Sequence, residues 1–448
     1  MTDAAARLRA GGGGAYRSWG RYPSAVPAEV VPVVWRSDLP PLARLPGPVL
    51  PYACGRSYGD SCLNDGGLVL DMRALDRLIA FDTEAGLLRC EAGVLLSDIL
   101  DLVVGQGWFL PVTPGTKFVT VGGAIANDVH GKNHHVNGCF SEHVAGFELL
   151  RSDGSRRWCS ADENADWFAA TAGGLGLTGL ITWAELRLTR VPGPGIALES
   201  IRFPGLDTFF ELAGQDQAFE YTVAWIDCLA RGRRLGRGIY MRGDHVPLDG
   251  PVPSPLGPAR LTIPADAPGG LLNRFTLGVF NEAYYRRQLG ARRRTVLPYP
   301  PFFFPLDGVG DWSRLYGRRG FVQYQCVVPE VADGAPIRAI LERIARSGEP
   351  ASLAVLKRFG SARSPGMLSF PREGITLAVD FAVRGQRTFA LLDELDAVVR
   401  SAGGAVYPAK DARMSPESFR AFFPGLERFR PYQDPKFSSS FWRRVHGD

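Results

Sequence analysis

Three glycine-rich loops constrain the fold of this 448-residue chain more than any other feature of its sequence. They read "CGRSYGDSCLN" (54–64), "TPGTKFVTVGGAIANDVHG" (113–131) and "GGLGLTG" (173–179). Successive glycines let the backbone come close to a ligand and point its N–H groups inward, which makes a nest for a pyrophosphate. Several such loops in one region predict a domain that holds a long dinucleotide.

Two of these loops contain motifs of other dinucleotide or hydrolase sites, but their contexts are wrong. "GLGLTG" (174–179) fits G-x-G-x-x-G, which needs a strand before it and a helix after it. Here "ADWFAATAG" precedes it and is helix-like, whereas "LITWAELRLT" follows it and is strand-like. "GRSYG" (55–59) fits the nucleophile elbow G-x-S-x-G, but turn-forming residues follow where that motif requires a helix. We therefore reject a Rossmann site and do not expect Ser57 to be a nucleophile.

The stretch "HGKNHH" (130–135) holds three of the six histidines. A metal site would place His130 and His134 on one helical face. Gly131 and Asn133 break such a helix, the stretch has no carboxylate, and Lys132 puts a cation between the two histidines. We therefore expect no zinc or iron here.

Composition narrows the class of protein. The hydrophobic content of 45% can fill a core, and neither a signal peptide nor a membrane-spanning run is evident, so we expect a cytoplasmic protein. The seven scattered cysteines show no C-x-x-C spacing, which argues against a disulfide framework or a zinc site. A net charge of +5 without a long basic run gives no reason to expect nucleic-acid binding.

Lysine is rare in this arginine-rich chain, so each lysine is a candidate for a task that needs a compact ammonium group. The five lysines are Lys117, Lys132, Lys357, Lys410 and Lys436. For Lys117 and Lys436 we expect ordinary surface positions.

The chain divides by pattern near "RVPGPG" (190–195), where proline and glycine cluster. Before this break, short apolar runs and glycine turns predict an α+β domain. After it, "GFVQYQCVVP", "PIRAILERIARSG" and "SLAVLKRFG" read as strand, helix and strand, and the order repeats with "GITLAVDFAV", "RTFALLDELDAVVRSAGG" and "AVYPAKDAR". This predicts a second domain in which helices cover one face of a sheet.

Alternation in these strands places polar residues on common faces. Gln323 lies with Gln325, Lys357 with Phe359, and Thr376 with Ala378 and Asp380. Either these faces line one pocket, or they are the wet side of a half-exposed sheet, and periodicity does not separate the two. For residues 284–312, the sequence slightly favours a solvated helix and a buried aromatic turn over a loop that meets an anionic, partly apolar ligand.

Taken together, "GRSYGD", "PGTKFVTVGGAIANDVHGKNHH" and "GGLGLTG" resemble the PCMH-type FAD-binding domain of the vanillyl-alcohol-oxidase family. Within it, the chain is similar to the decaprenylphosphoryl-β-D-ribose 2'-oxidases through further colinear motifs: "LGRGI", "FTLGVFNEAYYR", "FPLDGVGDW", "VLKRFG", "LSFP", "VDF" and "AKDAR". The resemblance implies a two-part FAD-binding domain, made of residues 1–193 and a C-terminal segment 405–448. Residues 194–404 would form a substrate or cap domain with an antiparallel sheet covered by helices.

The resemblance also assigns residues to the cofactor. Lys410 matches a lysine that stabilises the negative charge of the reduced flavin, and His130 would lie against the cofactor, so both are candidate catalytic residues. Tyr58 stands where many relatives attach the flavin through a histidine, so FAD should be non-covalent. The expected cofactor-binding residues are Ala53, Cys54, Gly55, Arg56, Ser57, Tyr58, Gly59, Asp60, Ser61, Gly115, Thr120, Val121, Gly122, Gly123, Asn127, His130, Ile181 and Tyr407.

The expected sugar pocket follows in the same way, with three departures from the family. Its candidate residues are Tyr58, Lys132, Phe303, Arg314, Gln323, Gln325, Lys357, Phe359 and Asp380, with Arg314 the weaker candidate, for a phosphate. Ala378 replaces a cysteine of the family, Thr376 an asparagine, and Phe303 a tyrosine. These changes leave hydride transfer intact but alter which sugar oxygens find a partner.

The resemblance implies FAD-dependent oxidation of a secondary sugar hydroxyl to a ketone. The expected substrate is C2' of a polyprenyl-phosphoryl ribose, in the first half of a ribose-to-arabinose epimerisation for the cell wall. A short-chain reductase would complete the inversion, a quinone or O2 would take the electrons, and the enzyme would work at the inner face of the membrane through peripheral contact. The alternative is oxidation of another sugar, a nucleoside or an aldonolactone on the same scaffold. A flavin-free binding protein is disfavoured by the intact glycine loops and Lys410.

Overall fold

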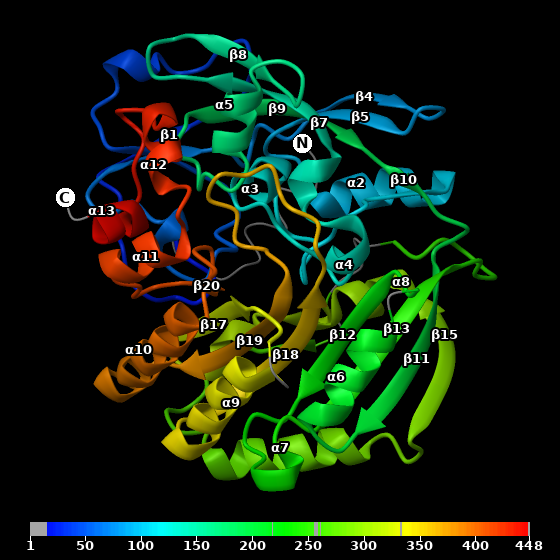
Figure 1. The fold of residues 1–448 in the computed structure, drawn as a ribbon. Coiled ribbons are helices and arrows are strands. Elements are labelled where there is room, and N and C mark those ends of the chain that lie inside the picture. The colour runs from blue at the N-terminus through cyan, green and yellow to red at the C-terminus, as the bar shows by residue number, and fades with distance from the viewer. Residues whose placement is uncertain (1–15, 217, 255–258, 260, 332–333, 447–448) are drawn as a thin grey trace.

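The structure is a computed structural model that describes residues 16–216, 218–254, 259, 261–331 and 334–446. Figure 1 shows the early strands and the C-terminal helices together in one half of the molecule, with a large sheet and its helices in the other. The chain therefore crosses from the first half to the second and returns.

The first half is built on a five-stranded antiparallel sheet and a three-stranded parallel sheet. The five-stranded sheet has the order β4 (Leu78–Asp82), β5 (Leu87–Glu91), β9 (Leu180–Arg187), β7 (Val144–Leu150), β8 (Arg156–Cys159). The three-stranded sheet has the order β1 (Glu29–Pro32), β3 (Leu68–Asp71), β2 (Val49–Tyr52), and the pair β6 (Trp108–Phe109) and β10 (Thr189–Arg190) lies apart. The helices are α2 (Leu96–Val103), α3 (Val121–Ala126), α4 (His134–Asn137) and α5 (Ala165–Thr171).

The second half is built on an eight-stranded sheet in which every neighbouring pair is antiparallel. Its order is β15 (Arg292–Pro298), β11 (Gly195–Phe203), β13 (Gly238–Val246), β12 (Tyr221–Ile226), β18 (Ala351–Phe359), β19 (Gly374–Ala382), β17 (Phe321–Val328), β20 (Ala405–Val406). A short parallel pair, β14 (Leu261–Thr262) and β16 (Val309–Gly310), lies beside it. All strands from β11 to β20 belong to this sheet except the short pair, so the second half is built around a single sheet.

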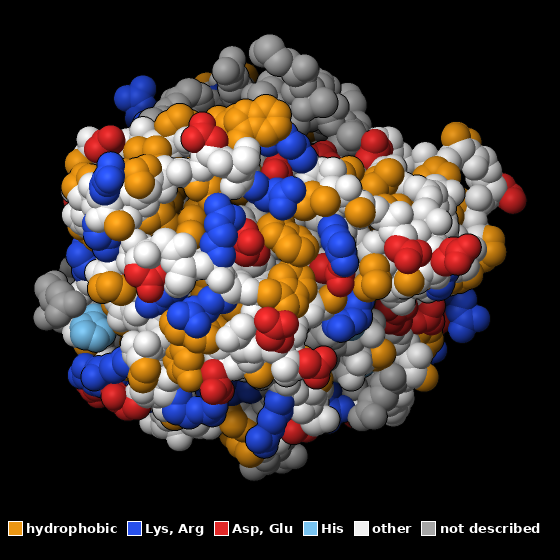
Figure 2. Space-filling model, turned by 90° about the horizontal axis from the view of Figure 1, so that it is seen from above, with side chains coloured by type: hydrophobic (Ala, Val, Ile, Leu, Met, Phe, Trp, Pro, Cys, Tyr) orange, Lys and Arg blue, Asp and Glu red, His pale blue; other side chains and the backbone are white. Residues whose placement is uncertain are grey.

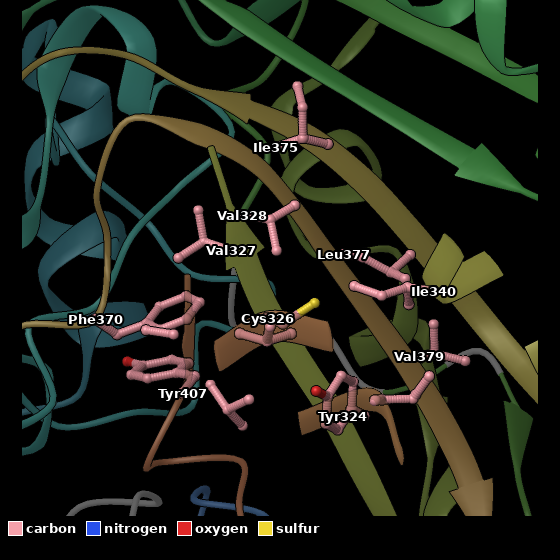
Figure 3. Packing of buried hydrophobic residues seen from close by; sticks show 14 of the residues in the cluster. Tyr324, Cys326, Val327, Val328, Ile340, Phe370, Ile375, Leu377, Val379 and Tyr407 are labelled. Atoms are coloured by element: carbon pink, nitrogen blue, oxygen red, sulfur yellow. The ribbon is translucent and has the colours of Figure 1, made fainter. Parts of the chain in front are cut away.

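Helices cover one face of this sheet and leave the other face toward the first half (Figure 1). The covering helices are α6 (Leu206–Gln215), α9 (Ala335–Ser347) and α10 (Gln386–Ser401). The helix α7 (Arg274–Arg286) lies near β18, and α8 (Tyr299–Phe303) lies near the edge strand β15. In α9, Ile337, Ile340, Leu341 and Ile344 recur at helical spacing and are all buried. Figure 3 shows Ile340 among the sheet side chains Cys326, Leu377 and Val379, which make up part of the larger core.

The C-terminal segment joins both halves. Its β20 pairs with β17 of the large sheet, and its helices α11 (Pro416–Phe422), α12 (Leu426–Phe429) and α13 (Ser440–His446) pack in the first half. The same core cluster contains Phe441 of α13, Val399 of α10 and Leu177 of the third glycine loop. This segment therefore bridges the two halves.

The α+β class, the antiparallel sheet and the helices predicted at 336–348 and 387–404 are confirmed by this architecture. The preference for a solvated helix and an aromatic turn in 284–312 is partly wrong, because Arg292–Pro298 is the edge strand β15. Residues 292–298 form a strand because they pair with β11, and the local sequence pattern does not reveal a partner so far away in the sequence.

The surface agrees with the weak net charge. On the face seen in Figure 2, Lys and Arg alternate with Asp and Glu, and no large area is purely basic. Within the described ranges, every helix is too short or too polar to cross a membrane.

Candidate active site

A cavity of about 1160 Å³ lies between the glycine loops and the uncovered face of the eight-stranded sheet. Ligand pockets usually measure roughly 300–1,000 Å³, so this one has room for a dinucleotide and a second molecule. The expected cofactor-binding residues that line it are Ala53, Cys54, Gly55, Arg56, Ser57, Tyr58, Ser61, Gly115, Thr120, Gly122, Gly123, Asn127, His130, Ile181 and Tyr407. Lys132, Phe303, Gln323, Gln325, Lys357, Asp380 and Lys410 line it as well.

The loop side of the cavity is formed by backbone held in fixed positions. Gly55 has φ +57°, and a Cβ there would collide with the Arg17 carbonyl and the Tyr52 hydroxyl, so the first loop requires glycine at this point. Tyr407 ties the second loop to the C-terminal segment, because its hydroxyl donates to the Asn127 carbonyl at 2.8 Å. Its ring also stacks on Phe370 at 4.6 Å between centroids (Figure 3).

The sheet side carries the polar face that alternation predicted, and it lines the pocket rather than facing solvent. Gln323 pairs in register with Asp380, Gln325 with Ala378, and Lys357 with Thr376. All six side chains line the cavity. This decides between the two alternatives that periodicity left open.

A buried carboxylate, Asp380, and the ammonium of Lys410 line this cavity and influence each other's charge. Asp380 is fully buried and accepts hydrogen bonds from Gln323 and from the Tyr316 hydroxyl. Burial raises the pKa of Asp380 to about 7, and burial lowers the pKa of Lys410 to about 7, with the Asp380 charge opposing that shift. The Lys410 Nζ lies 3.6 Å from the centre of the Tyr58 ring, a cation–π contact.

The "HGKNHH" stretch places a neutral imidazole and the ammonium group of Lys132 in the same cavity. His130 Nδ1 lies 3.2 Å from Lys357 Nζ, and His130 Nε2 lies 2.8 Å from the Gln325 amide. Burial and then the Lys357 charge hold the pKa of His130 well below its usual value, so this imidazole is neutral at pH 7. Lys132 Nζ donates to the Phe303 carbonyl at 3.0 Å, and burial lowers its pKa to about 8.

The remaining residues of the stretch hold the loop in place. Asn133 donates to the Pro111 carbonyl at 2.7 Å, His135 Nε2 lies 2.8 Å from the Phe219 carbonyl, and His134 packs on the Phe359 ring at 4.3 Å. Among the described residues, no group of three or more His, Cys, Asp or Glu side chains could hold a metal ion.

Five of the expected site residues lie outside the cavity lining. Val121 is fully buried in the core beneath α3, and Gly59 abuts the Asp411 carbonyl so closely that a Cβ would overlap it. Asp60 is bound by Arg444. Arg314 donates to the Ile263 and Pro264 carbonyls, and Phe359 lies behind His130 and His134.

The two lysines expected at the surface are engaged in contacts. Lys117 is only 6% exposed and forms an ion pair with Asp307 at 3.7 Å. Lys436 donates to the Ala43 and Leu45 carbonyls. The expectation is wrong for Lys117, which is buried. Lys436 is only half-buried, and at the surface it joins two segments that are distant in sequence.

Sequence reasoning missed the apolar part of the cavity. Its lining includes Leu198, Val223, Trp225, Ile239, Met241 and Leu297, from β11, β12, β13 and β15. Alternation in "YTVAWI" and "GIYMRGDHV" could have assigned their faces, but not which face meets the glycine loops.

The residues present fit FAD in shape and in charge. Glycine backbone lines the loop side, as a pyrophosphate requires. The lining has six basic side chains, Arg56, Lys132, Arg287, Arg293, Lys357 and Lys410, against the two carboxylates Asp307 and Asp380. Of these carboxylates, Asp307 is paired with Lys117 and Asp380 has a raised pKa, so the cavity favours an anionic ligand.

Comparison with known proteins also indicates a FAD-binding protein. Residues 42–160 match the FAD binding domain family. The chain is 39% identical over 414 residues to the decaprenylphosphoryl-β-D-ribose oxidase of Mycolicibacterium smegmatis, covering 89% of each chain. It is 36% identical over 375 residues to an uncharacterised Streptomyces coelicolor protein, covering 79% of this chain and all of the relative. The human Δ(24)-sterol reductase is 32% identical over 111 residues, 25% of this chain and 22% of the reductase.

The fold, the glycine-lined cavity and the domain match define a FAD-dependent oxidoreductase. The chain belongs to the PCMH-type FAD-binding oxidoreductases, in the family of decaprenylphosphoryl-β-D-ribose oxidase.

Proposed function

We propose that this enzyme oxidises a secondary sugar hydroxyl to a ketone, at C2' of a polyprenyl-phosphoryl ribose, as the first half of a ribose-to-arabinose epimerisation. The observation that carries the proposal is the buried cluster of Lys410, His130, Gln325, Lys357 and Asp380 at the point where the glycine loops meet the sheet. A sugar there would find several donors and acceptors, and the 39% identical relative bears the name of such an oxidase.

We propose that residues 1–193 and 405–448 hold FAD and that residues 194–404 cap it; residues 1–15 and 447–448 of these ranges lie outside the described part. The lining residues of the glycine loops, with Ile181 and Tyr407, would hold the cofactor. When bound, FAD supplies the hydride acceptor for the alcohol carbon. Tyr58 offers a phenol where relatives carry a linking histidine, so we propose non-covalent binding.

Loss of a hydride from the alcohol carbon requires that the hydroxyl proton leave as well, and Lys357 can take it. Burial, together with the nearby Lys132 and Lys410 charges, lowers the pKa of Lys357 to about 7, so a neutral amine is available at neutral pH. His130 is neutral and lies 3.2 Å from this amine, between it and Gln325. Lys357 can therefore accept the proton, and its contact with His130 Nδ1 holds the amine in place.

Lys410 would stabilise negative charge as it develops on the cofactor side. A preorganised ammonium acts more strongly on a developing charge when bound ligands exclude water from the site than it does in solvent. The Tyr58 ring holds it in place, and Asp380 favours its charged form.

The phosphate of the substrate would meet lysines rather than Arg314, whose guanidinium is occupied by backbone carbonyls. The ketone product calls for a reductase that delivers hydride to the other face, for which a short-chain reductase is the proposed partner. A quinone or O2 would reoxidise the flavin. A lipid-linked substrate also places the reaction at the inner face of the membrane.

The second candidate is oxidation of a soluble sugar, a nucleoside or an aldonolactone. It is favoured by Thr376, Ala378 and Phe303, which depart from the family's pocket and all line the cavity.

Anaerobic bleaching of the flavin separates these candidates. The purified enzyme would be mixed with prenyl-phosphoryl ribose, prenyl-phosphoryl arabinose, free pentoses, nucleosides and aldonolactones, and the flavin absorbance followed. We expect rapid bleaching with prenyl-phosphoryl ribose. Faster bleaching with a free sugar or a nucleoside would overturn the proposal in favour of the second candidate.

A further inference from the structure

The connection between β18 and β19, residues 360–373, leaves the large sheet and crosses to the first half of the molecule. Figure 1 shows it rising from the sheet toward α3 and α5. The Met367 N–H donates to the Ala169 carbonyl of α5 at 2.9 Å, and a Cβ on Gly425 of the C-terminal segment would overlap the Met367 carbonyl. We call residues 360–373 the strap, because they join the sheet to the first half. All of them are described, and none of them lines the cavity.

The strap is anchored on one carboxylate, that of Asp128 in the second glycine loop. Asp128 is fully buried, and its Oδ2 accepts hydrogen bonds from the Ser364 and Ser369 hydroxyls. Its Oδ1 accepts a hydrogen bond from the Ser141 N–H at 3.1 Å. The backbone of Asp128 has φ +41°, a left-handed conformation that residues other than glycine rarely adopt. Such a conformation persists only where the surrounding contacts impose it, and it is often found at functional sites.

Both ends of the strap lie against His130. Phe359, the last residue of β18 before the strap, packs on the His130 ring at 4.8 Å between centroids. Phe370, directly after the second anchoring serine, lies 6.1 Å from the same ring. Phe370 also stacks on Tyr407 (Figure 3), whose hydroxyl donates to the second glycine loop. Both phenylalanines are buried, so the strap restricts the imidazole while Asp128 fixes the strap.

This imidazole is the one that contacts the proposed proton acceptor. His130 Nδ1 lies 3.2 Å from Lys357 Nζ, and His130 Nε2 lies 2.8 Å from the Gln325 amide. A rotation of the ring would weaken both contacts together, because hydrogen bonds weaken steeply as their angle departs from linear. Lys357 belongs to the strand that leads into the strap, so the anchor, the imidazole and the amine form one connected unit.

We propose that Asp128, Ser364 and Ser369 are positioning residues that clamp the strap on the second glycine loop and thereby fix the direction of the His130 ring. Through this ring they hold the Lys357 amine in place. The role of Lys357 as proton acceptor rests on the proposed function, whereas the clamp on His130 does not depend on the substrate. Three residues outside the cavity lining therefore contribute to proton removal.

The protonation of His130 tests the clamp without any substrate. The FAD-loaded enzyme would carry isotope-labelled histidine, and the ring nitrogens of its six histidines would be followed by NMR between about pH 5 and 8. His130→Gln assigns the signal. The titratable groups around His130 are Lys357 on β18, His134 on α4, Cys139 across a β-bridge, Asp128, and Lys410 and Tyr407 on the C-terminal segment.

Burial and then the Lys357 charge lower the pKa of His130, so the wild-type ring should stay neutral over this range. In the double variant Ser364→Ala/Ser369→Ala, the released strap admits water to the ring. The pKa of His130 should then rise toward the ordinary value of about 6.5, and its signals should titrate within the range. Signals identical to those of wild type would overturn the proposal. Ser369→Ala alone should give the same change to a smaller extent, and it serves if the double variant does not fold.

Stopped-flow reduction by farnesylphosphoryl ribose separates positioning from binding. We expect the double variant to retain FAD and to reduce it about tenfold or more slowly, with the Kd of the sugar lipid nearly unchanged. The matched control is Thr388→Ala, which removes the hydroxyl that donates to the buried Glu349 carboxylate at 3.0 Å on the helix-covered face. It should change neither the His130 signals nor the rate. A raised Kd with an unchanged rate would overturn the proposal. If the His130 signals change as expected but farnesylphosphoryl ribose does not reduce the wild-type flavin, the clamp stands and the proposed reaction fails.

Discussion

Three lysine side chains line one cavity, and their chemistry explains why lysine rather than arginine stands at these positions. Burial lowers the pKa of Lys132 to about 8 and the pKa values of Lys357 and Lys410 to about 7. A guanidinium would stay charged under the same burial, whereas an ammonium can lose its proton. One cavity can therefore offer both a neutral amine to a hydroxyl and a cation to an anion.

Lys410 is the residue whose loss should affect the reaction most. Lys410→Ala should bind FAD nearly normally, because the glycine loops hold the cofactor elsewhere, but flavin reduction should slow by roughly 100-fold or more. Lys410→Arg should rescue poorly, since a planar guanidinium does not occupy the place of an ammonium on the Tyr58 ring. Stopped-flow reduction by the true substrate is the measurement. Rates within a few fold of wild type in Lys410→Ala would refute the assignment.

Lys357 should make the stability of the flavin-free protein depend on pH. Its pKa is lowered from 10.5 to about 7 in the folded state, so between these values the unfolded chain binds more protons and stability rises with pH. From pH 6 to 8.5, wild type should gain about 1–2 kcal/mol in unfolding free energy relative to Lys357→Met. Urea denaturation at both pH values checks this, with the exposed Arg292→Met as control. A parallel pH dependence in wild type and Lys357→Met would contradict it.

Tyr58 should leave the flavin free to dissociate. Tyr58 lines the cavity, and its pKa is raised by burial and by Asp380, so the phenol remains protonated and is a poor nucleophile toward the flavin. Acid or heat denaturation should release all the FAD into the supernatant, as absorbance at the flavin band would show. Colour that stays with the precipitated protein would contradict non-covalent binding.

Sequence periodicity correctly predicted which side chains share a face of a single strand. It did not predict which residues of different strands or loops come into contact. Alternation grouped Gln323 with Gln325 on one strand, and separately Ala378 with Asp380 on another, and all four line the cavity. In α3, Val121 follows Thr120 in sequence but turns inward, because successive helical residues point about 100° apart. Arg314 lies elsewhere because its partners are about 50 residues away, a distance over which no local pattern extends.

Asp60 was also expected to bind the cofactor, but it pairs with a residue that is distant in the sequence. In the helix α13, Arg444 reaches both Asp60 of the first glycine loop and Asp411 next to Lys410. The two carboxylates are 4% and 3% exposed, so one guanidinium is the cation shared by two buried acidic groups. We infer that Arg444 positions the Lys410 loop against the flavin loop.

Arg444→Gln should lower the free energy of unfolding by about 3–5 kcal/mol, since it leaves both buried carboxylates without their cation. The matched control Arg430→Gln breaks only an exposed pair with Glu427 and should cost about 0–1 kcal/mol. Urea denaturation gives both values. Without Arg444 the pKa of Asp60, already raised by burial, rises further, so the deficit should shrink as the pH falls toward 4. A deficit that does not change with pH would argue against unpaired carboxylates as its cause.

At the scale of the whole molecule, the cavity lies between two halves that the C-terminal segment holds together. Asp434 is fully buried and accepts hydrogen bonds from the Ser152 and Lys436 N–H groups, and Arg151 pairs with it at 3.3 Å. The segment on either side contributes to the core of the large sheet and to the first half. Neither half closes the cavity alone, so cofactor binding should depend on their association.

Cooperative unfolding should therefore release the flavin in one step. During heating, the rise in flavin fluorescence and the loss of far-UV circular dichroism should share one midpoint, as expected when the halves unfold together. Asp434→Asn removes the charge from a buried ion pair and should lower both midpoints equally, because breaking such a pair costs about 3–5 kcal/mol. The control Asp153→Asn, in an exposed turn, should leave both midpoints in place. Release of flavin well below the main transition, with the sheet still folded, would show that the halves separate before they unfold and would contradict this coupling.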